Sequence, residues 1–236
     1  MSPSRVPPPA SPPRRRSDTS PWRHLVRGLA GLAVLGAVAA HADTPDDRAR
    51  NGMAGAGLRR PVACLPRCRV IKLVDRDPRA GMVRDVPGGE RATDGHAGID
   101  IAAAAMVPGQ MSVSGRVLVL AVESGRVVAV RTGMADRDAR AVPRWWLAGR
   151  EGGNVVVVDH GDGLRSDYAH LAEGSISVRV GDRVRRGQVL GRPGMSGYAA
   201  FEHVEFRLIL RGRVVDPVAD GILTMAQLEG AGDPAR

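Results

Sequence analysis

Residues Gly153–Leu171 read GNVVVVDHGDGLRSDYAHL. Two strand-like runs in this stretch, Asn154–His160 and Leu164–His170, flank the turn Gly161-Asp162-Gly163. β-branched and aromatic residues favour strands, and a short connection that contains glycine favours a β-hairpin. The stretch therefore predicts two antiparallel strands joined by a tight turn.

Short strand-like runs separated by turns continue on both sides of this hairpin. Apolar residues make up 43% of the chain but aromatic residues only 3%, so the core is expected to consist of Val, Leu, Ile and Ala. Frequent Gly and Pro favour many short strands over long helices. We predict a mostly β fold, an antiparallel β sandwich or groove with short hairpins. The further runs are Arg69–Val74, Val117–Val122 and Arg126–Val130 (joined by the hairpin signal Glu123-Ser124-Gly125), and His203–Leu210 and Arg213–Val215 (joined by Arg211-Gly212).

The first 42 residues have the three-part pattern of a secretory signal peptide. A Pro/Arg-rich segment ends at Arg27, the apolar run Gly28–Ala40 follows, and Ala40-His41-Ala42 is an A-x-A cleavage site. The apolar run is shorter than the about 20 residues that a transmembrane helix needs. We expect cleavage after Ala42, export to the periplasm or cell envelope, and no stable membrane span after processing. An uncleaved N-terminal anchor is the alternative.

The net charge of +9 is concentrated near the N-terminus. Six of the 34 basic residues and one of the 25 acidic residues precede residue 43, which leaves a net charge of +4 on the rest. This charge suits an anionic wall polymer, and it is also ordinary for a soluble domain. No basic cluster is interleaved with stacking aromatic residues, so nucleic acid is not expected as a partner.

Cys64 and Cys68 are the only two cysteines. Two nearby thiols in an exported chain usually oxidise, so we expect a Cys64–Cys68 disulfide. A zinc site made by these two residues alone is not expected, because structural zinc sites use four ligands.

His96 and Asp100 form the pair H-x-x-x-D in the segment His96-Ala-Gly-Ile-Asp100. On a straight strand these positions share a face but stand about 13 Å apart, too far to share a metal ion. A helix would bring them together, but the glycines at 95 and 98 disfavour one. A bend at Gly98 would bring both side chains to one ion.

His203 and Glu205 form a second pair, His203-Val-Glu205. Residues i and i+2 of a strand point the same way and lie roughly 6–7 Å apart. One of them can therefore bind a metal ion while the other reaches a water bound to it. Nitrogen and oxygen donors from three side chains, with a fourth position open, describe a catalytic zinc site.

The order and context of these segments resemble the lysostaphin/LytM-type zinc metallopeptidases, which have the duplicated hybrid motif fold. The resemblance covers about His96 to Pro217 and implies a groove lined by antiparallel sheet, with one zinc ion at its floor. It also implies cleavage of peptide bonds in peptidoglycan. The matching segments are DGHAGIDIA (Asp94–Ala102), SGRVVAV (Ser124–Val130), Gly153–Leu171, VRVGDRVRRGQVLGRPGMSG (Val178–Gly197), EHVEFRL (Glu202–Leu208) and VDP (Val215–Pro217).

The resemblance also implies roles for individual residues. His96 and Asp100 correspond to the first two zinc ligands. His203 corresponds to the catalytic histidine next to the metal-bound water, and His170 to a histidine that polarises the attacked carbonyl. His160 falls in the family's usual His-Gly turn, where its role is structural.

The chain departs from the family at Glu205, where the pattern His-x-His has its second histidine as the third zinc ligand. A carboxylate can also bind zinc, but it lowers the formal charge of the site from +1 to 0. We therefore expect a zinc metalloendopeptidase of peptidoglycan cross-links or stem peptides with reduced activity. The alternative is a non-catalytic LytM-like module that binds cell wall or activates another wall hydrolase. Because His96, Asp100, His170 and His203 are all retained, the enzyme is favoured.

The predicted organisation has four parts. Residues 1–42 are the signal peptide, 43–68 a linker and cysteine-containing lead-in, 69–220 the LytM-like domain, and 221–236 a C-terminal tail. The pair Trp145-Trp146 lies in a long loop of this domain. It is interpreted either as a substrate platform at the groove rim or as a hydrophobic anchor under the loop.

Overall fold

The computed structural model of the chain describes residues 57–64, 67–76, 84–85, 91–92, 95–103 and 117–229. The predicted signal peptide and most of the predicted linker therefore lie outside the described residues, and their assignment remains a prediction. Among the described residues, no helix is long and apolar enough to cross a membrane.

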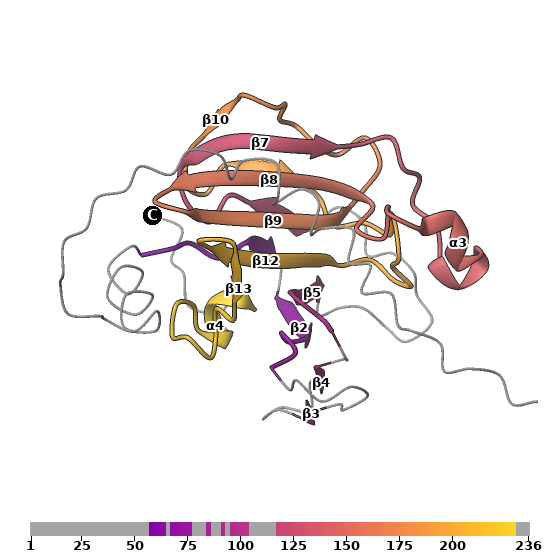
Figure 1. The fold of residues 1–236 in the computed structure, drawn as a ribbon, viewed down its shortest axis with the longest axis horizontal. Helices are drawn as coiled ribbons and strands as arrows, with labels where there is room; N and C mark the ends of the chain where they lie inside the picture. The colour runs from indigo at the N-terminus through magenta and orange to yellow at the C-terminus, as the bar shows by residue number, and fades with distance from the viewer. Residues whose placement is uncertain are drawn as a thin grey trace, which may run out of the picture. The chain divides into compact units, whose positions relative to one another are not determined.

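The described part of the chain consists mainly of short strands, with three helical segments of one turn each (Figure 1). This confirms the predicted mostly β fold. The helical segments are η2 (Ala139–Ala141), α3 (Arg144–Leu147) and α4 (Met225–Leu228). The strands are β1 (Val62–Cys64), β2 (Cys68–Lys72), β3 (Arg84–Asp85), β4 (Arg91–Ala92), β5 (Ile99–Ala103), β6 (Val117–Leu120), β7 (Gly125–Arg131), β8 (Asn154–Gly161), β9 (Leu164–Leu171), β10 (Arg183–Val184), β11 (Val189–Gly191), β12 (Val204–Leu210) and β13 (Arg213–Val215).

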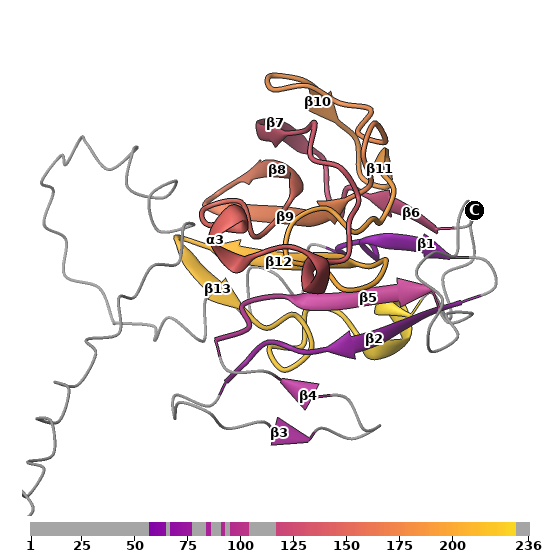
Figure 2. The ribbon, with the colours of Figure 1, turned by 90° about the vertical axis from the view of Figure 1, so that its right-hand side faces the viewer.

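The strands of the described residues form three sheets, and the pairings between these strands are antiparallel. The main sheet has eight strands in the order β10-β7-β8-β9-β12-β5-β2, with β13 also beside β12. A smaller sheet has the order β1-β6-β11, and β3 pairs with β4 alone. Figure 2 shows β5 and β2 side by side at one edge of the main sheet.

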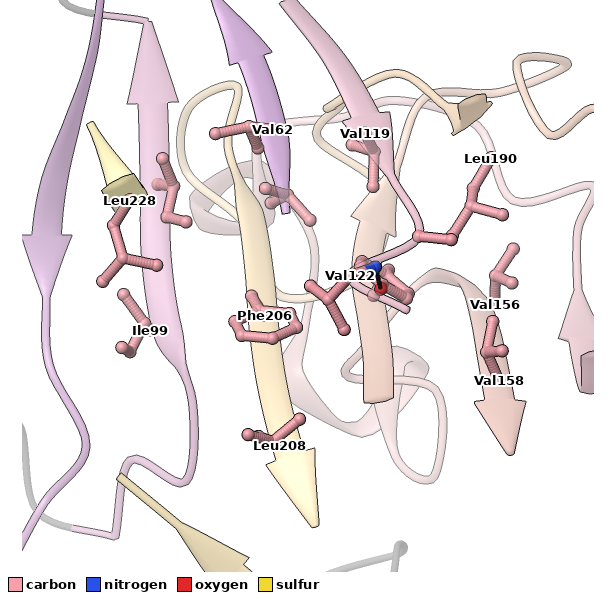
Figure 3. Packing of buried hydrophobic residues seen from close by; sticks show 14 of the residues in the cluster. Val62, Ile99, Val119, Val122, Val156, Val158, Leu190, Phe206, Leu208 and Leu228 are labelled. Carbon is pink, nitrogen blue, oxygen red and sulfur yellow. Dashed lines mark hydrogen bonds between the residues drawn. The ribbon is translucent and has the colours of Figure 1, made fainter. Parts of the chain in front are cut away.

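The hydrophobic core lies between the main sheet and the three-stranded sheet. Val62 and Val119 from the small sheet and Phe206 from β12 are fully buried in one cluster (Figure 3). Burial alternates along β12, where Val204, Phe206 and Leu208 are buried and the residues between them are less so. Because successive side chains of a strand point to opposite faces, the odd-numbered positions of β12 lie on the face away from this core.

Two of the predicted hairpins are confirmed. β8 pairs with β9 across Gly161–Gly163, where Asp162 has a φ of 49° between two glycines that also have positive φ. β12 pairs with β13 across Arg211 and Gly212, whose φ values are 50° and 79°. Such tight turns need left-handed backbone, which glycine adopts without steric cost.

The hairpin predicted around Glu123-Ser124-Gly125 is wrong. β6 pairs with β1 and β11, whereas β7 pairs with β8 and β10, so the chain passes from one sheet to the other between them. The backbone N–H of Val122 donates to the hydroxyl of Tyr168 at 2.9 Å instead of to a strand partner (Figure 3). Turn residues predict a reversal of the chain but not which strands then pair.

Described residues on both sides of the predicted range 69–220 also pack against the core. Leu58 is buried, and β1 supplies a partner strand for β6. At the other end Leu228 on α4 is fully buried, and the N–H of Cys68 donates to the carbonyl of Glu229. Both flanking segments therefore contribute to the core, because they carry apolar side chains that fill it. The predicted disulfide between Cys64 and Cys68 is present and links β1 to β2.

Candidate metal centre

Five side chains singled out from the sequence converge on the main sheet. β5 and β12 are neighbours, and their pairing sets Asp100 directly opposite Glu205. His96 and His203 lie just before these two strands, and His170 lies near the end of β9, the other neighbour of β12. Strand pairing thus brings together residues that are about a hundred positions apart in the sequence.

His96 and Asp100 meet at the bend that precedes β5. His96 Nδ1 donates to the carbonyl of Leu73 at 2.9 Å, and Nε2 lies 3.0 Å from Asp100 Oδ1. Gly98 forms the expected bend between them. Two ligand atoms at the zinc distance of about 2.0–2.2 Å in a tetrahedral site lie roughly 3.3–3.6 Å apart, close to the spacing seen here.

Glu205 completes a group of three possible ligands. One oxygen of Glu205, one of Asp100 and a ring nitrogen of His96 all lie within 4.8 Å of one another. The Glu205 carboxylate also has protein partners, since Oε1 accepts from Arg207 and Oε2 lies 3.4 Å from His170 Nε2. A Cβ atom added at Gly98 would lie 2.7 Å from Glu205 Cγ, so only glycine leaves room for this side chain.

His203 is held as a neutral base next to this group. Its Nδ1 donates to the carbonyl of Phe201 at 2.9 Å, and Nε2 lies 3.8 Å from Asp100 Oδ1. Burial lowers the pKa of His203 to about 4, although the charge of Asp100 opposes this shift. At neutral pH the ring is therefore uncharged, with Nε2 free to accept a proton.

His170 lies against both Glu205 and His203, and its ring centre is 4.8 Å from that of His203. It has a φ of 59°, an uncommon conformation for a residue other than glycine, and Nδ1 donates to the carbonyl of Ser196 at 2.8 Å. Burial alone would lower the pKa of His170, but the hydrogen bond and charge of Glu205 raise it above its ordinary value. The ring can therefore donate a hydrogen bond from Nε2.

Both carboxylates stay ionised despite their burial. Burial would raise the pKa of Asp100, but the charge of His203, which is protonated in the acidic range where Asp100 titrates, and the hydrogen bond from His96 lower it. Burial would likewise raise the pKa of Glu205, but the hydrogen bond from His170 and the charge of Arg207 lower it well below its ordinary value. Two negative charges held side by side suit a cation.

Two basic residues at this centre were not found from the sequence. Lys72 Nζ lies 3.7 Å from Asp100 Oδ2, and Arg207 pairs with Glu205. The position of Arg207 could have been found, because it follows Glu205 by two residues on a predicted strand. Lys72 could not, because its place depends on the pairing of β2 with β5.

The remaining candidates lie elsewhere. His160 bonds to the carbonyl of Ser124 and to Ser166 Oγ, at 3.0 and 2.8 Å, which fits the structural role expected of it. Trp145 on α3 is 77% exposed, whereas Trp146 is partly buried, with the guanidinium of Arg150 5.8 Å from its ring centre.

The antiparallel β domain thus gathers His, Asp and Glu ligand atoms that could hold a metal ion. Residues 94–217 match Peptidase family M23, and the chain belongs to this family. The resemblance to lysostaphin/LytM-type proteins is thereby confirmed.

Two curated proteins and one solved structure illustrate the similarity. The peptidoglycan DD-endopeptidase ShyA of Vibrio cholerae is 39% identical over 70 residues, 30% of this chain and 16% of that protein. The glycyl-glycine endopeptidase ALE-1 of Staphylococcus capitis is 37% identical over 74 residues, 31% and 20% of the two chains. The catalytic domain of lysostaphin from Staphylococcus simulans aligns with a TM-score of 0.34 and 24% identity, over 57% of this chain and 80% of that one. The match thus spans a fifth or less of each of these two curated relatives.

Proposed function

We propose that this chain is a zinc metalloendopeptidase that hydrolyses peptide bonds in peptidoglycan cross-links or stem peptides. The observation that carries the proposal is the group His96, Asp100 and Glu205, whose ligand atoms lie within 4.8 Å of one another. Membership of family M23 and the two curated relatives, both named as endopeptidases, support the same chemistry.

The donor set fits zinc. His96 Nε2 and Asp100 Oδ1 already have a spacing suited to two ligands, and a Glu205 oxygen lies within 4.8 Å of the ligand atoms of both residues. One imidazole and two carboxylates would leave a fourth position open. When bound there, zinc lowers the pKa of a water molecule and polarises a carbonyl group.

His203 and His170 would carry the proton and the developing charge. His203 is neutral and has Nε2 available, so it takes a proton from the attacking water and delivers it to the departing amine. His170 is held by Ser196 and donates from Nε2 to the carbonyl oxygen as that atom becomes negative. The 4.8 Å between the two ring centres lets one peptide group reach both.

Glu205 is expected to slow this reaction. A carboxylate in place of a neutral histidine reduces the charge of the site, which raises the pKa of bound water. The carboxylate must also give up part of its contact with His170 or Arg207 to bind a metal.

The test combines metal content with a digest. The purified protein, supplied with zinc, is expected to hold one zinc per chain and to release peptide fragments from muropeptides, as measured by mass spectrometry. Asp100→Ala should lose both properties, and His203→Ala should keep zinc but lose cleavage. If the zinc-loaded protein releases no peptide fragment, the proposed endopeptidase function is wrong.

The second candidate function is a non-catalytic module that binds cell wall or activates another wall hydrolase. It is favoured by the contacts of Glu205, whose two oxygens both have protein partners. In that case zinc-free protein should cosediment with purified peptidoglycan as well as zinc-loaded protein does, and neither should cleave it.

A further inference from the structure

The two carboxylates of the candidate metal centre each contact a basic side chain. Lys72 Nζ lies 3.7 Å from Asp100 Oδ2, and the Arg207 guanidinium bonds to Glu205 Oε1. Neither basic residue belongs to the predicted ligand set. Both come from neighbouring positions of the sheet, since Lys72 is paired with Asp100 across β2 and β5, and Arg207 follows Glu205 by two residues on β12.

The two contacts differ in burial. The side chains of Arg207 and Glu205 are 11% and 13% exposed, so water screens this ion pair little. Arg207 also lies opposite Asp167 of β9, and the charges of these two side chains attract each other. The Lys72 side chain is 39% exposed, and its contact with Asp100 is correspondingly weaker.

Each of the two carboxylates already has a basic partner without a metal ion. Asp167, whose charge also acts on Glu205, adds a third carboxylate opposite Arg207. A divalent ion bound by Asp100 and Glu205 would lie close to the two cations Lys72 and Arg207. Repulsion between like charges at such distances inside a protein is large.

We propose that Lys72 and Arg207 are counter-ions that compete with zinc for Asp100 and Glu205, and that Arg207 sets the zinc affinity. Glu205 is packed against Gly98 and bonded at both oxygens, so a metal ion has to draw it away from a bonded partner. The inference rests on the proposed function only in taking zinc as the metal.

The opposite role for Arg207 makes the opposite prediction. Side chains that hydrogen-bond a metal-binding carboxylate often orient it, and their removal weakens metal binding. If Arg207 orients Glu205 in this way, its removal must lower the zinc affinity. If Arg207 competes with zinc, its removal must raise it.

The experiment measures the Kd for zinc by competition with a chromophoric chelator. The proteins are the wild type, Arg207→Gln, Lys72→Gln and the control Arg165→Gln. Arg165 lies on β9 two residues from Asp167 and pairs with Asp159, so its removal takes a positive charge from the same face without touching Glu205. We expect at least tenfold tighter binding in Arg207→Gln, a gain of a few-fold in Lys72→Gln, and less than a twofold change in the control.

Thermal unfolding with and without zinc provides a second readout. Zinc-free Arg207→Gln should melt below the wild type, because Glu205 loses its counter-ion, and saturating zinc should raise its Tm more than it raises that of the wild type. An unchanged or weaker zinc affinity in Arg207→Gln overturns the inference. Tighter zinc binding without cleavage of muropeptides would instead reject the proposed function and leave the inference standing.

Discussion

Glu205 is the residue at which the chemistry of this chain differs most from the pattern of its family. It lies opposite Asp100 on the neighbouring strand and is bonded by Arg207 and His170. The substitution of a carboxylate for an imidazole therefore changes both the charge of the centre and the partners of the ligand. Comparing a histidine and an alanine at position 205 separates the effect of the carboxylate charge from the effect of losing the ligand altogether.

Glu205→His restores the His-x-His pattern and is expected to raise the rate of muropeptide cleavage at saturating zinc at least tenfold. The reason is that a neutral ligand leaves the centre more positive, so bound water ionises at lower pH. The rate is measured per bound zinc, with Glu205→Ala as the matched variant that loses the ligand. If Glu205→His and wild type cleave equally fast, the charge of residue 205 does not limit the reaction.

Asp167, on β9 beside this centre, makes stability depend on pH. Burial raises the pKa of Asp167 from 3.8 to about 6, although the charge of Arg207 opposes the shift. The folded chain thus binds this proton more tightly than the unfolded chain, so the stabilising contribution is complete below pH 3.8 and is lost as the pH rises through 6. At pH 8 the loss of this contribution lowers the free energy of unfolding by an amount of the order of 3 kcal/mol.

Asp167→Asn removes this titration. The free energy of unfolding of the zinc-free variant, relative to that of the wild type, should increase between pH 4.5 and pH 8 by about 2–3 kcal/mol. Urea denaturation at both pH values measures the difference. A difference that does not change with pH would show that Asp167 has the same pKa in the folded and unfolded chains.

At the scale of strands, local signals were enough wherever the partner strand follows directly in the sequence. The β8–β9 and β12–β13 hairpins were predicted from their turn residues. The partners of β6 were not, because Val117–Leu120 pairs with β1 and β11, and neither β1 nor β11 is adjacent to it in the sequence. Lys72 was missed for the same reason, since the pairing of β2 with β5 decides its place.

A buried hydroxyl group bonds to the backbone where the chain passes between the two sheets. The fully buried Tyr168 accepts from the N–H of Val122 at 2.9 Å and lies 3.0 Å from Ser166 Oγ. Tyr168→Phe would leave that buried N–H unpaired, which costs about 1–3 kcal/mol. Chemical denaturation should detect this loss, whereas Tyr198→Phe, at a half-exposed position, should change stability by less than about 0.5 kcal/mol. An equal effect of both substitutions would contradict the role given to this bond.

At the scale of the whole domain, one face of β12 packs into the core and the other carries the side chains of the candidate metal centre. Its even-numbered residues, such as Phe206, pack into the core between the sheets, and its odd-numbered residues, Glu205 and Arg207, lie at the candidate metal centre. Motifs carried by short segments singled out side chains that strand pairing brings together, and their roles in metal binding and catalysis stay predictions. The domain limits 69–220 stay a prediction, because burial of apolar side chains outside them, such as Leu58 and Leu228, bears on where the folded unit ends.

The C-terminal segment tests these limits. Leu228 on α4 is fully buried, and the helix begins with a capping box between Thr224 and Gln227. Leu228→Ala should therefore lower the free energy of unfolding by about 2–5 kcal/mol, as for other buried leucines. Val180→Ala, at a 62% exposed position, is the control and should cost less than about 0.5 kcal/mol. If Leu228→Ala were as stable as this control, the segment after residue 220 would be a tail, as the sequence predicts; a large loss would make it part of the core that supports the sheet.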